Sequence, residues 1–388
     1  MTERLYYHDA YLADFDATVV DRADDGRRVY LNRTAFYPAS GGQPFDTGRL
    51  GESDVVDVVD EGERIAHLLA GPVAGDRVRG LVDWPRRFDH MQQHTGQHLL
   101  SAVIADRFGH ETVSVHFGRD SSTLDLAAAA LPPDRVAEVE RLANRRVTEN
   151  RPVTVEFDDA SRAIGLRKPT DRQGTIRIVT IDGVDRSACG GTHVRATGEI
   201  GAILIRKVER VKQLVRLEFL CGERAVRRAR ADADLLSGIA ASHSAAADEL
   251  PALLESQRAE LKAATAARRE LEDAVAGFRA RELYASVAPD ARGRRVAIVR
   301  EAQGPIERLR ALGQAYAALP AAVFIGMVES PPALLVAAGT DVGMDAGRVL
   351  KAALEARGGR GGGNARSAQG TVQDVADLEP VLASLLGG

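Results

Sequence analysis

Hydrophobic and polar residues alternate in short runs over the first 85 residues of the chain. The runs ADFDATVVDR and RRVYLNR flank the turn sequence ADDG, and DVVDVV, IAHLLA and RVRGLVDW follow between glycine and proline positions. Runs of this length that are rich in Val, Ile and Leu are typical of β-strands, and the first two should form a hairpin. Short strands at this spacing predict a small β-barrel over residues 1–88.

From about Arg87 to Phe108 the apolar positions change to a helical period, which continues in a single stripe through Ile104. A second amphipathic helix is predicted in PPDRVAEVERLANRRVTENR, where Pro133 suits the first turn. Strand patterns occur in TVSVHFG, STLDLA, PVTVEF, TIRIVTI, GAILIRKVER and VRLEFLCG. This mixture predicts an α+β domain over residues 89–222.

Residues 223–286 are dominated by Ala, Arg, Glu and Leu, and Pro251 stands where a second helix could begin. Apolar residues fall on the a and d positions of a seven-residue repeat, namely Leu254, Leu261, Leu271, Val275 and Phe278. We therefore predict an antiparallel helical hairpin, which would either space the flanking domains or dimerise.

Strand and helix patterns alternate over residues 287–388 and predict a small α/β domain. A glycine-rich segment, GGRGGGNARSAQG at residues 358–370, lies between two of its predicted elements. It follows a helix, so it is not a dinucleotide-binding fingerprint. It is either a flexible linker or a loop whose backbone N–H groups, with Arg360 and Arg366, meet phosphates, because no acidic residue occurs from Ala356 to Gln373. The whole chain is predicted to have an α+β fold.

Composition narrows the class of protein. The chain of 388 residues is 45% hydrophobic and 27% charged with a net charge of −4, which favours a globular protein of two or three domains. The apolar runs are too short to span a membrane and the N-terminus lacks a signal-peptide pattern, so we expect a cytoplasmic protein without a membrane partner. One segment is basic: residues 206–230 hold nine Lys or Arg and three Glu. This segment is either a solvated face or a local basic surface for nucleic acid.

Four histidine and cysteine residues form a candidate metal site. His94 and His98 are four residues apart and can share one face of the predicted helix, although a single HxxxH pair is often only part of a core. Cys189 and His193 are separated by GGT, which permits a tight bend. Three imidazoles and one thiolate form a set that suits one Zn²⁺ per chain. His90 lies two helical turns before His98, about 12 Å along the axis, which is too far for both to bind one ion.

Three ordered motifs carry a resemblance to a known family. HTGQHLLSA, the distant CGGTHV and the glycine-rich TAFYPASGGQPFDTG resemble the editing domain of alanyl-tRNA synthetases and of their free-standing relatives, the AlaX proteins. The predicted hairpin and the GGRGGG segment are similar to the C-terminal, DHH-associated domain of the same enzymes. The glycine-rich segment departs from that pattern, since Asn-Ala-Arg-Ser stands where the synthetases commonly have Arg-Pro-Asp-Met.

The resemblance implies a long, free-standing, zinc-dependent editing hydrolase. Its expected partner is tRNA(Ala) mischarged with serine or glycine, whose aminoacyl ester it would hydrolyse. Because the chain begins at the editing barrel, it is expected neither to bind ATP nor to activate alanine. A homodimer through the C-terminal half is also expected, as related proteins form one.

Further residues are assigned by motif position. Thr34 is the candidate for hydrogen bonding the serine hydroxyl, which could reject alanine strongly. Gln43 would orient water or substrate, and Asp185 would support a ligand imidazole. The residues expected to contact the substrate are Gly41, Gly42, His90 and Arg216, and those expected to contact tRNA are Arg360 and Arg366. The simpler alternatives are a strand-end Thr34 and a turn-stabilising Gln43.

Two other functions stay open. The same fold could edit a different mischarged tRNA, such as a threonine tRNA, because threonyl-tRNA synthetases carry related motifs. Alternatively, the chain could be a non-catalytic tRNA-binding module with a structural zinc. The positions of Thr34 and Gln43 relative to the metal ligands separate the catalytic from the structural hypothesis.

Overall fold

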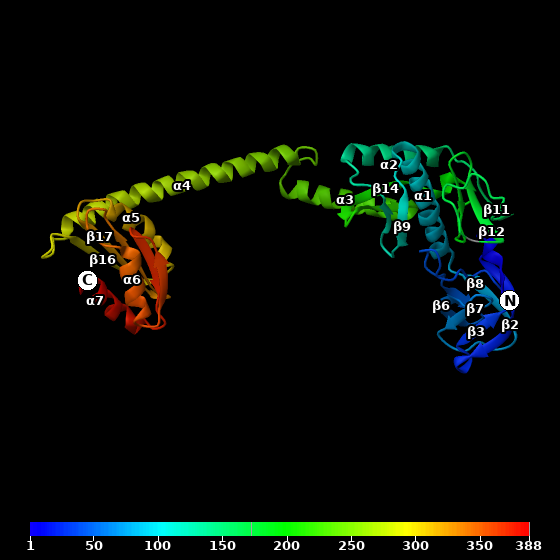
Figure 1. The fold of residues 1–388 in the computed structure, drawn as a ribbon, viewed down its shortest axis with the longest axis horizontal. Coiled ribbons are helices and arrows are strands. Elements are labelled where there is room, and N and C mark those ends of the chain that lie inside the picture. Colours follow the sequence, from blue (N-terminus) through cyan, green and yellow to red (C-terminus); the bar gives the residue numbers. More distant parts are fainter. Residues whose placement is uncertain (172, 388) are drawn as a thin grey trace. The chain divides into compact units, whose positions relative to one another are not determined.

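The computed structural model describes residues 1–171 and 173–387, which divide into two compact units, residues 1–243 and 244–388 (Figure 1). Both units mix helices and strands, as predicted, and seven α-helices occur among the described residues. The finer boundaries predicted at residues 88, 222 and 286 stay predictions. No helix of the described chain is both long and apolar enough to cross a membrane.

The first unit begins with the predicted closed barrel. Its strands follow the order β2-β3-β7-β6-β5-β8. Their bounds are Asp14–Ala23 (β2), Arg28–Leu31 (β3), Gly48–Leu50 (β5), Ser53–Asp60 (β6), Ile65–Leu69 (β7) and Arg77–Val82 (β8). Side chains of β2 alternate between solvent and the interior, where Phe15, Ala17 and Val19 are buried. The short β1 (Glu3–Arg4) pairs in parallel with β4 (Arg33–Thr34).

The glycine-rich segment between β4 and β5 has no regular secondary structure, as predicted. It is nevertheless fixed, because the buried Asp46 accepts hydrogen bonds from the buried Arg87 at 3.0 and 3.1 Å and from the Tyr37 amide at 2.6 Å. At its tip Gly41 and Gly42 have positive φ angles of 57° and 85°, which favour glycine. The ion pair therefore holds this loop against the helix that carries Arg87.

That helix, α1 (Trp84–Phe108), is the central element of the first unit. Asp83 caps its N-terminus and Gly109 ends it in the left-handed conformation. Nearly every residue from His90 to Ile104 is buried, because the helix contacts α2 (Pro133–Thr148), α3 (Gly222–Ser242) and two sheets. One sheet has the order β14-β15-β10-β9 and the other β11-β12-β13.

The strands of these sheets are mostly those predicted. Their bounds are Thr112–Phe117 (β9), Ser122–Leu126 (β10), Val153–Asp159 (β11), Thr175–Ile181 (β12), Asp185–Ala188 (β13), Ile203–Val211 (β14) and Leu214–Cys221 (β15). The sequence did not predict β13, which pairs with β12 and leads directly into Cys189.

Both predicted helices of residues 223–286 form: α3 belongs to the first unit and α4 (Leu250–Ser286) to the second. Their pairing as a hairpin is a relation between the units and stays a prediction. The heptad residues of α4 are exposed within the second unit, with Leu261 at 70% and Phe278 at 67%.

The rest of the second unit is a five-stranded sheet of order β16-β17-β18-β20-β19 with helices packed against it. Its elements are β16 (Arg295–Gln303), α5 (Arg310–Ala317), β17 (Ala322–Ser330), β18 (Pro332–Ala338), α6 (Ala346–Glu355), β19 (Arg360–Gly363), β20 (Ser367–Thr371) and α7 (Leu378–Gly387). The predicted small α/β domain is thus present as a sheet covered by helices.

The glycine-rich segment of this unit is a correction to the prediction of a loop or linker. Most of it forms the antiparallel pair β19 and β20 at the sheet edge. A Cβ at Gly361 would approach the Gly370 Cα to 3.0 Å, so the glycines allow the two strands and α6 to pack closely. Arg360 and Arg366 are exposed on this hairpin.

Candidate metal centre

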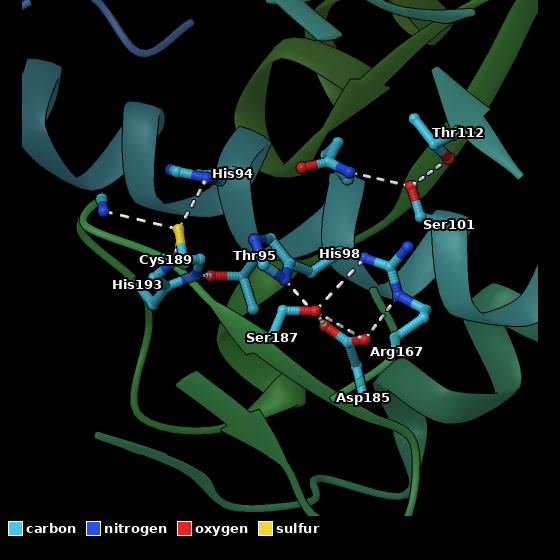
Figure 2. A network of polar contacts seen from close by, with 12 residues as sticks. His94, Thr95, His98, Ser101, Thr112, Arg167, Asp185, Ser187, Cys189 and His193 are labelled. Carbon is cyan, nitrogen blue, oxygen red and sulfur yellow. Dashed lines mark hydrogen bonds and ion pairs between the residues drawn. The ribbon is translucent and has the colours of Figure 1, made fainter. Parts of the chain in front are cut away.

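Four side chains from distant parts of the sequence meet beside α1. His94 and His98 lie on α1, Cys189 follows β13, and His193 lies four residues further along (Figure 2). One donor atom from each of them lies within 4.8 Å of all the others. The structure therefore brings together the four residues that the sequence predicted as metal ligands.

Local sequence explains how the second pair is presented. The buried guanidinium of Arg177 donates to the carbonyl oxygens of Cys189 and Gly191 at 2.8 and 2.9 Å, which fixes the turn between Cys189 and His193. A Cβ at Gly191 would overlap the His94 imidazole. The glycine at this position is therefore required for the turn to approach α1 so closely.

Each imidazole has a partner at its Nδ1 atom. Asp185 Oδ2 lies 2.7 Å from His98 Nδ1, Gln43 Oε1 lies 2.8 Å from His94 Nδ1, and Thr95 Oγ1 lies 3.1 Å from His193 Nδ1. Asp185 is itself held by Ser187 and by Arg167, whose Nε lies 2.6 Å from Oδ1 (Figure 2). Asp185 thus occupies the position predicted for it, next to a ligand imidazole.

The surrounding hydrogen bonds define the tautomers. Thr95 donates its only hydroxyl hydrogen to the Met91 carbonyl at 2.8 Å, so it must accept from His193 Nδ1–H. The Gln43 amide donates to Thr192 Oγ1 and its oxygen accepts from the Thr192 amide, so this oxygen also accepts from His94 Nδ1–H. All three imidazoles therefore direct Nε2 away from these partners, and the Nε2 atoms of His94 and His193 lie 3.4 and 3.3 Å from Cys189 Sγ.

Charge at the site favours a cation. Burial would raise the pKa of Cys189, but His94 and His193 hold it well below its usual value, which favours the thiolate. Burial would lower the pKa of His98, but Asp185 and Cys189 raise it to about 9. Burial and His94 lower the pKa of His193 to about 3. A divalent ion would take the place of the proton on His98.

The donor set fits zinc. Zinc sites commonly combine thiolate and imidazole donors, and metal-bound histidines usually donate their second ring N–H to a carboxylate or another acceptor. The four residues supply one thiolate and three Nε2 donors, and all three Nδ1 atoms have acceptors. The residues therefore fit a single zinc ion.

The other predicted site residues divide into two groups. Gln43 lies at the cluster, bonded to His94. Thr34 is fully buried, and its hydroxyl lies 2.8 Å from Nε2 of the buried His67; among the described residues, no hydrogen bond joins it to the four ligands. This arrangement matches the strand-end alternative for Thr34.

Two further predictions concern glycines and a basic residue. Gly42 packs beside Val115 and Phe117, and the Phe117 ring lies 5.0 Å from that of His94, so this part of the loop borders the site. Gly41 lies in open space at the same turn. Arg216 is on β15 and pairs with Asp125 of β10 at 2.7 and 2.9 Å, and among the described residues no hydrogen bond or ion pair joins it to the four ligands.

His90 and the two C-terminal arginines complete the predicted set. His90 is buried one helical turn before His94 and lines a neighbouring cavity. Arg360 and Arg366 belong to the second unit and are not described relative to the site. Thr95 and Thr192 were not predicted, because their partners lie 98 and 149 residues away in the sequence. The only sequence signal for them was their position inside the two ligand motifs.

The chain is similar to known proteins of one family. Residues 176–218 match the family model described as the threonyl and alanyl tRNA synthetase second additional domain. The alanyl-tRNA editing protein AlaX-M of Methanosarcina acetivorans is 40% identical over 231 residues, which cover 54% of this chain and 94% of that protein. AlaX-L of Pyrococcus horikoshii is 37% identical over 58% of this chain and 59% of its own length.

The chain is also similar to a much longer enzyme. The alanine–tRNA ligase of Pyrococcus abyssi is 31% identical over 99% of this chain. The match covers only 43% of the ligase, so the activities of the whole ligase do not transfer with the similarity.

Proposed function

The chain belongs to the family of alanyl-tRNA editing proteins, and from this premise we propose that it deacylates tRNA(Ala) mischarged with serine or glycine. The proposal includes one zinc ion held by His94, His98, Cys189 and His193. The observation that carries it is the contact between Gln43 of the glycine-rich loop and the ligand His94. This contact places the loop directly beside the proposed metal site.

The reaction is hydrolysis of an aminoacyl ester, which requires a positioned water and a stabilised carbonyl oxygen. When bound, a zinc ion supplies Lewis acidity and a fixed positive charge at this place. Gln43 uses its oxygen and one amide hydrogen in bonds to His94 and Thr192, which leaves its second amide hydrogen for a substrate carbonyl or a water. Because Gln43 is buried and held from two sides, it would present this donor in one orientation.

The residues next to His98 act through the ligand. Asp185 accepts from His98 Nδ1–H and is held by Arg167 and Ser187. We assign it a positioning role, because its carboxylate fixes the ring and strengthens the donor character of Nε2. Serine selection through Thr34 remains a prediction, since its hydroxyl is bonded to His67.

A structural zinc in a non-catalytic tRNA-binding module is the competing hypothesis. The bond between Gln43 and His94 favours catalysis, whereas the bond between Thr34 and His67 favours the structural alternative. A deacylation assay separates the two. Editing needs no ATP, because the ester bond is already activated.

The test is to incubate the zinc-loaded protein with Ser-, Gly- and Ala-charged tRNA(Ala) and with Ser-charged tRNA(Thr), and to follow release of the amino acid. We expect release from Ser- and Gly-tRNA(Ala) and little from the other two. Absence of serine release above a chelator-treated control would refute the proposal. Faster release from tRNA(Thr) would instead reassign the tRNA.

A further inference from the structure

We propose that a cavity beside the metal centre binds the single-stranded 3′ end of tRNA; the inference rests on the proposed function and names where its substrate is held. The cavity has a volume of about 720 Å³. It is formed by the start of α1, the segment after β9 and the start of α3. Its lining includes Trp84, Phe88, His90, Arg86, Arg119 and Arg224.

The cavity adjoins the metal ligands through two chain segments. Pro44, which lines it, follows Gln43, the partner of His94. His90, which also lines it, lies one turn before His94 on α1. Residues one turn apart on a helix are neighbours, so a group in the cavity would lie next to the site.

Aromatic side chains form one wall of the cavity. The rings of Trp84 and Phe88 are 5.5 Å apart and inclined by 34°, and Tyr11 packs against Trp84 at 5.3 Å. Trp84 and Phe88 are only partly buried, so their rings can be reached from the cavity. Unpaired bases stack on such surfaces with about 1–3 kcal/mol per base. The unpaired bases at the 3′ end of tRNA have this chemistry.

His90 supplies an unpartnered polar group. The side chain is 5% exposed, and its Nδ1 atom has no hydrogen-bond partner among the described residues. A buried polar atom without a partner is costly, so one is expected to be satisfied by a water or a ligand. A ribose hydroxyl or a base edge of a bound nucleoside could provide that partner.

Arginines continue from this cavity into a second one of about 530 Å³. Arg119, Arg224 and Arg227 line both, and Arg206 and Arg228 line the second. Together the two cavities hold six arginines and four acidic residues, an excess of two positive charges in a chain of net charge −4. The basic segment noted in the sequence, residues 206–230, supplies four of these arginines.

The arginines differ in how they are bound. Arg224 is held by Asp89 at 2.6 Å and by the Gly118 carbonyl at 2.8 Å, so it shapes the cavity wall. Arg119 is exposed and makes no ion pair or hydrogen bond within the described structure. It is thus available for a phosphate. Arg228, by contrast, is paired with Asp232 at 2.5 Å. We place the terminal nucleoside against Trp84 and Phe88 and the preceding phosphate at Arg119.

The chain contains a single tryptophan, Trp84, so its fluorescence reports on this cavity. The experiment titrates the zinc-loaded full chain with uncharged tRNA(Ala) and with the same tRNA lacking its last three nucleotides. We expect the intact tRNA to change Trp84 emission and the trimmed tRNA to leave it unchanged while still binding elsewhere. An equal change with both, or no change with intact tRNA, would overturn the proposal.

Variants test the phosphate contact. We expect Arg119→Gln to weaken binding of intact tRNA about fivefold and to reduce the slope of log affinity against log salt by about 1. The matched control is Arg141→Gln, an exposed arginine of α2 outside both cavities, which should change neither. Equal effects of the two variants would refute the contact.

Deacylation is measured in parallel, which keeps the two proposals distinguishable. Serine release without a response of Trp84 to tRNA would leave the editing function standing and refute the cavity. A response that requires the 3′ end, without serine release, would support the cavity and refute the editing function.

Discussion

At the residue scale, each of the three imidazoles is oriented by a hydrogen bond at its Nδ1 atom. Each Nδ1–H has a different acceptor: a carboxylate at His98, an amide oxygen at His94 and a hydroxyl at His193. A preset ring loses little freedom on binding an ion. The strength of the site should therefore depend on these partners as well as on the four donors.

Removing a ligand and removing its partner should have different results. We expect His98→Ala to lose both zinc and activity. Gln43→Ala should retain one zinc per chain at saturating metal, bind it about 10–100-fold more weakly and hydrolyse more slowly, because His94 loses its acceptor. Metal content by atomic absorption, chelator competition and serine release measure these effects.

The control for Gln43→Ala is Gln97→Ala, which removes a buried glutamine of α1 that bonds to Ser101 rather than to a ligand. It should leave zinc affinity unchanged. Loss of zinc from Gln43→Ala at saturating metal would contradict the division between ligand and partner.

His67 predicts a pH dependence of stability. Burial lowers its pKa from 6.5 to about 4, although the bond to the Val29 carbonyl opposes this shift. Between these values the unfolded chain binds a proton that the folded chain does not, so acidification favours unfolding. When the pH falls from 7 to 5, protonation of this group in the unfolded chain should lower the free energy of unfolding by about 2 kcal/mol.

The variant that isolates this effect is His67→Gln, in which the titrating group is absent. Urea unfolding at pH 7 and pH 5 should show that the wild type loses about 2 kcal/mol more than the variant. Equal losses would mean that the pKa of His67 does not differ between the folded and the unfolded chain.

The residues predicted correctly share a local cause. HTGQH and CGGTH each define a pair through spacing along a helix or around a glycine turn, so each half of the cluster was visible in the sequence. The meeting of the halves was inferred from their combined donor chemistry, which suits zinc, and the family resemblance supported it. The contact of Thr34 with His67 depends on how β4 lies against β7, and no local pattern encodes it.

At the scale of elements, α1 is buried on almost every side, and this constrains its glycine. Gly96 lies between the two ligand histidines, and a Cβ there would overlap Cys221 Sγ and approach Ile200 Cγ2 to 3.3 Å. The helix thus contacts β15 through a residue that has no side chain. Glycine lowers helix propensity, so close packing explains its presence here.

Two glycine substitutions should therefore have opposite effects on the free energy of unfolding. Gly96→Ala should destabilise the protein by about 1–3 kcal/mol, because the methyl group overpacks the core. Gly238→Ala, in α3 with open space around it, should stabilise by about 0.5–1 kcal/mol through helix propensity. Chemical unfolding of both variants provides the comparison.

The double variant Gly96→Ala with Cys221→Ala tests the cause. In the Cys221→Ala background, Gly96→Ala should reduce the free energy of unfolding by less than it does in the wild type, because the sulfur that the methyl group overlaps is absent. Additive effects would show that the overlap with Cys221 is not the source of the destabilisation.

Elements with strong periodicity were predicted, and the exceptions have physical reasons. Five of the six barrel strands and the long helices follow clear apolar patterns, whereas β5 has only three residues and was not predicted. The strand β13 has only four residues and a polar sequence, so its pairing with β12 left no apolar signature. The strand β19 is three-quarters glycine at an exposed sheet edge, and it forms through close backbone approach rather than side-chain burial.

At the scale of the whole molecule, the proposed functions divide between the two units. The metal ligands and both arginine-lined cavities belong to residues 1–243, whereas Arg360 and Arg366 belong to residues 244–388. A relative of the editing family matches 54% of this chain with 94% of its own length. We therefore expect that the proposed deacylation does not require every part of the chain.

Dimerisation through the C-terminal half and a cytoplasmic location stay predictions at this scale. The exposed apolar residues of α4, such as Leu261 and Leu271, give the expected dimer a chemical basis, because a second copy could cover them. Burial of these residues by a second copy does not depend on tRNA binding.

Removing residues 244–388 tests the division of labour. The cut lies just after α3 and leaves the cores of the first unit intact. We expect kcat at saturating Ser-tRNA(Ala) to stay within about twofold and KM to rise about tenfold, because a second RNA contact on the same chain increases apparent affinity. Zinc content and the unfolding midpoint of the shortened chain are the controls for folding.

The full chain with Arg360→Gln and Arg366→Gln separates RNA contact from other effects of the deletion. If the hairpin of β19 and β20 contacts tRNA, this variant should raise KM, although by less than the tenfold expected for the deletion. The salt dependence of KM should also fall, because fewer counterions are released from tRNA when a phosphate contact is lost. An unchanged KM after the deletion would show that the second unit makes no contact that matters for tRNA affinity. A fall in kcat with zinc retained would instead show that the second unit contributes to the reaction itself.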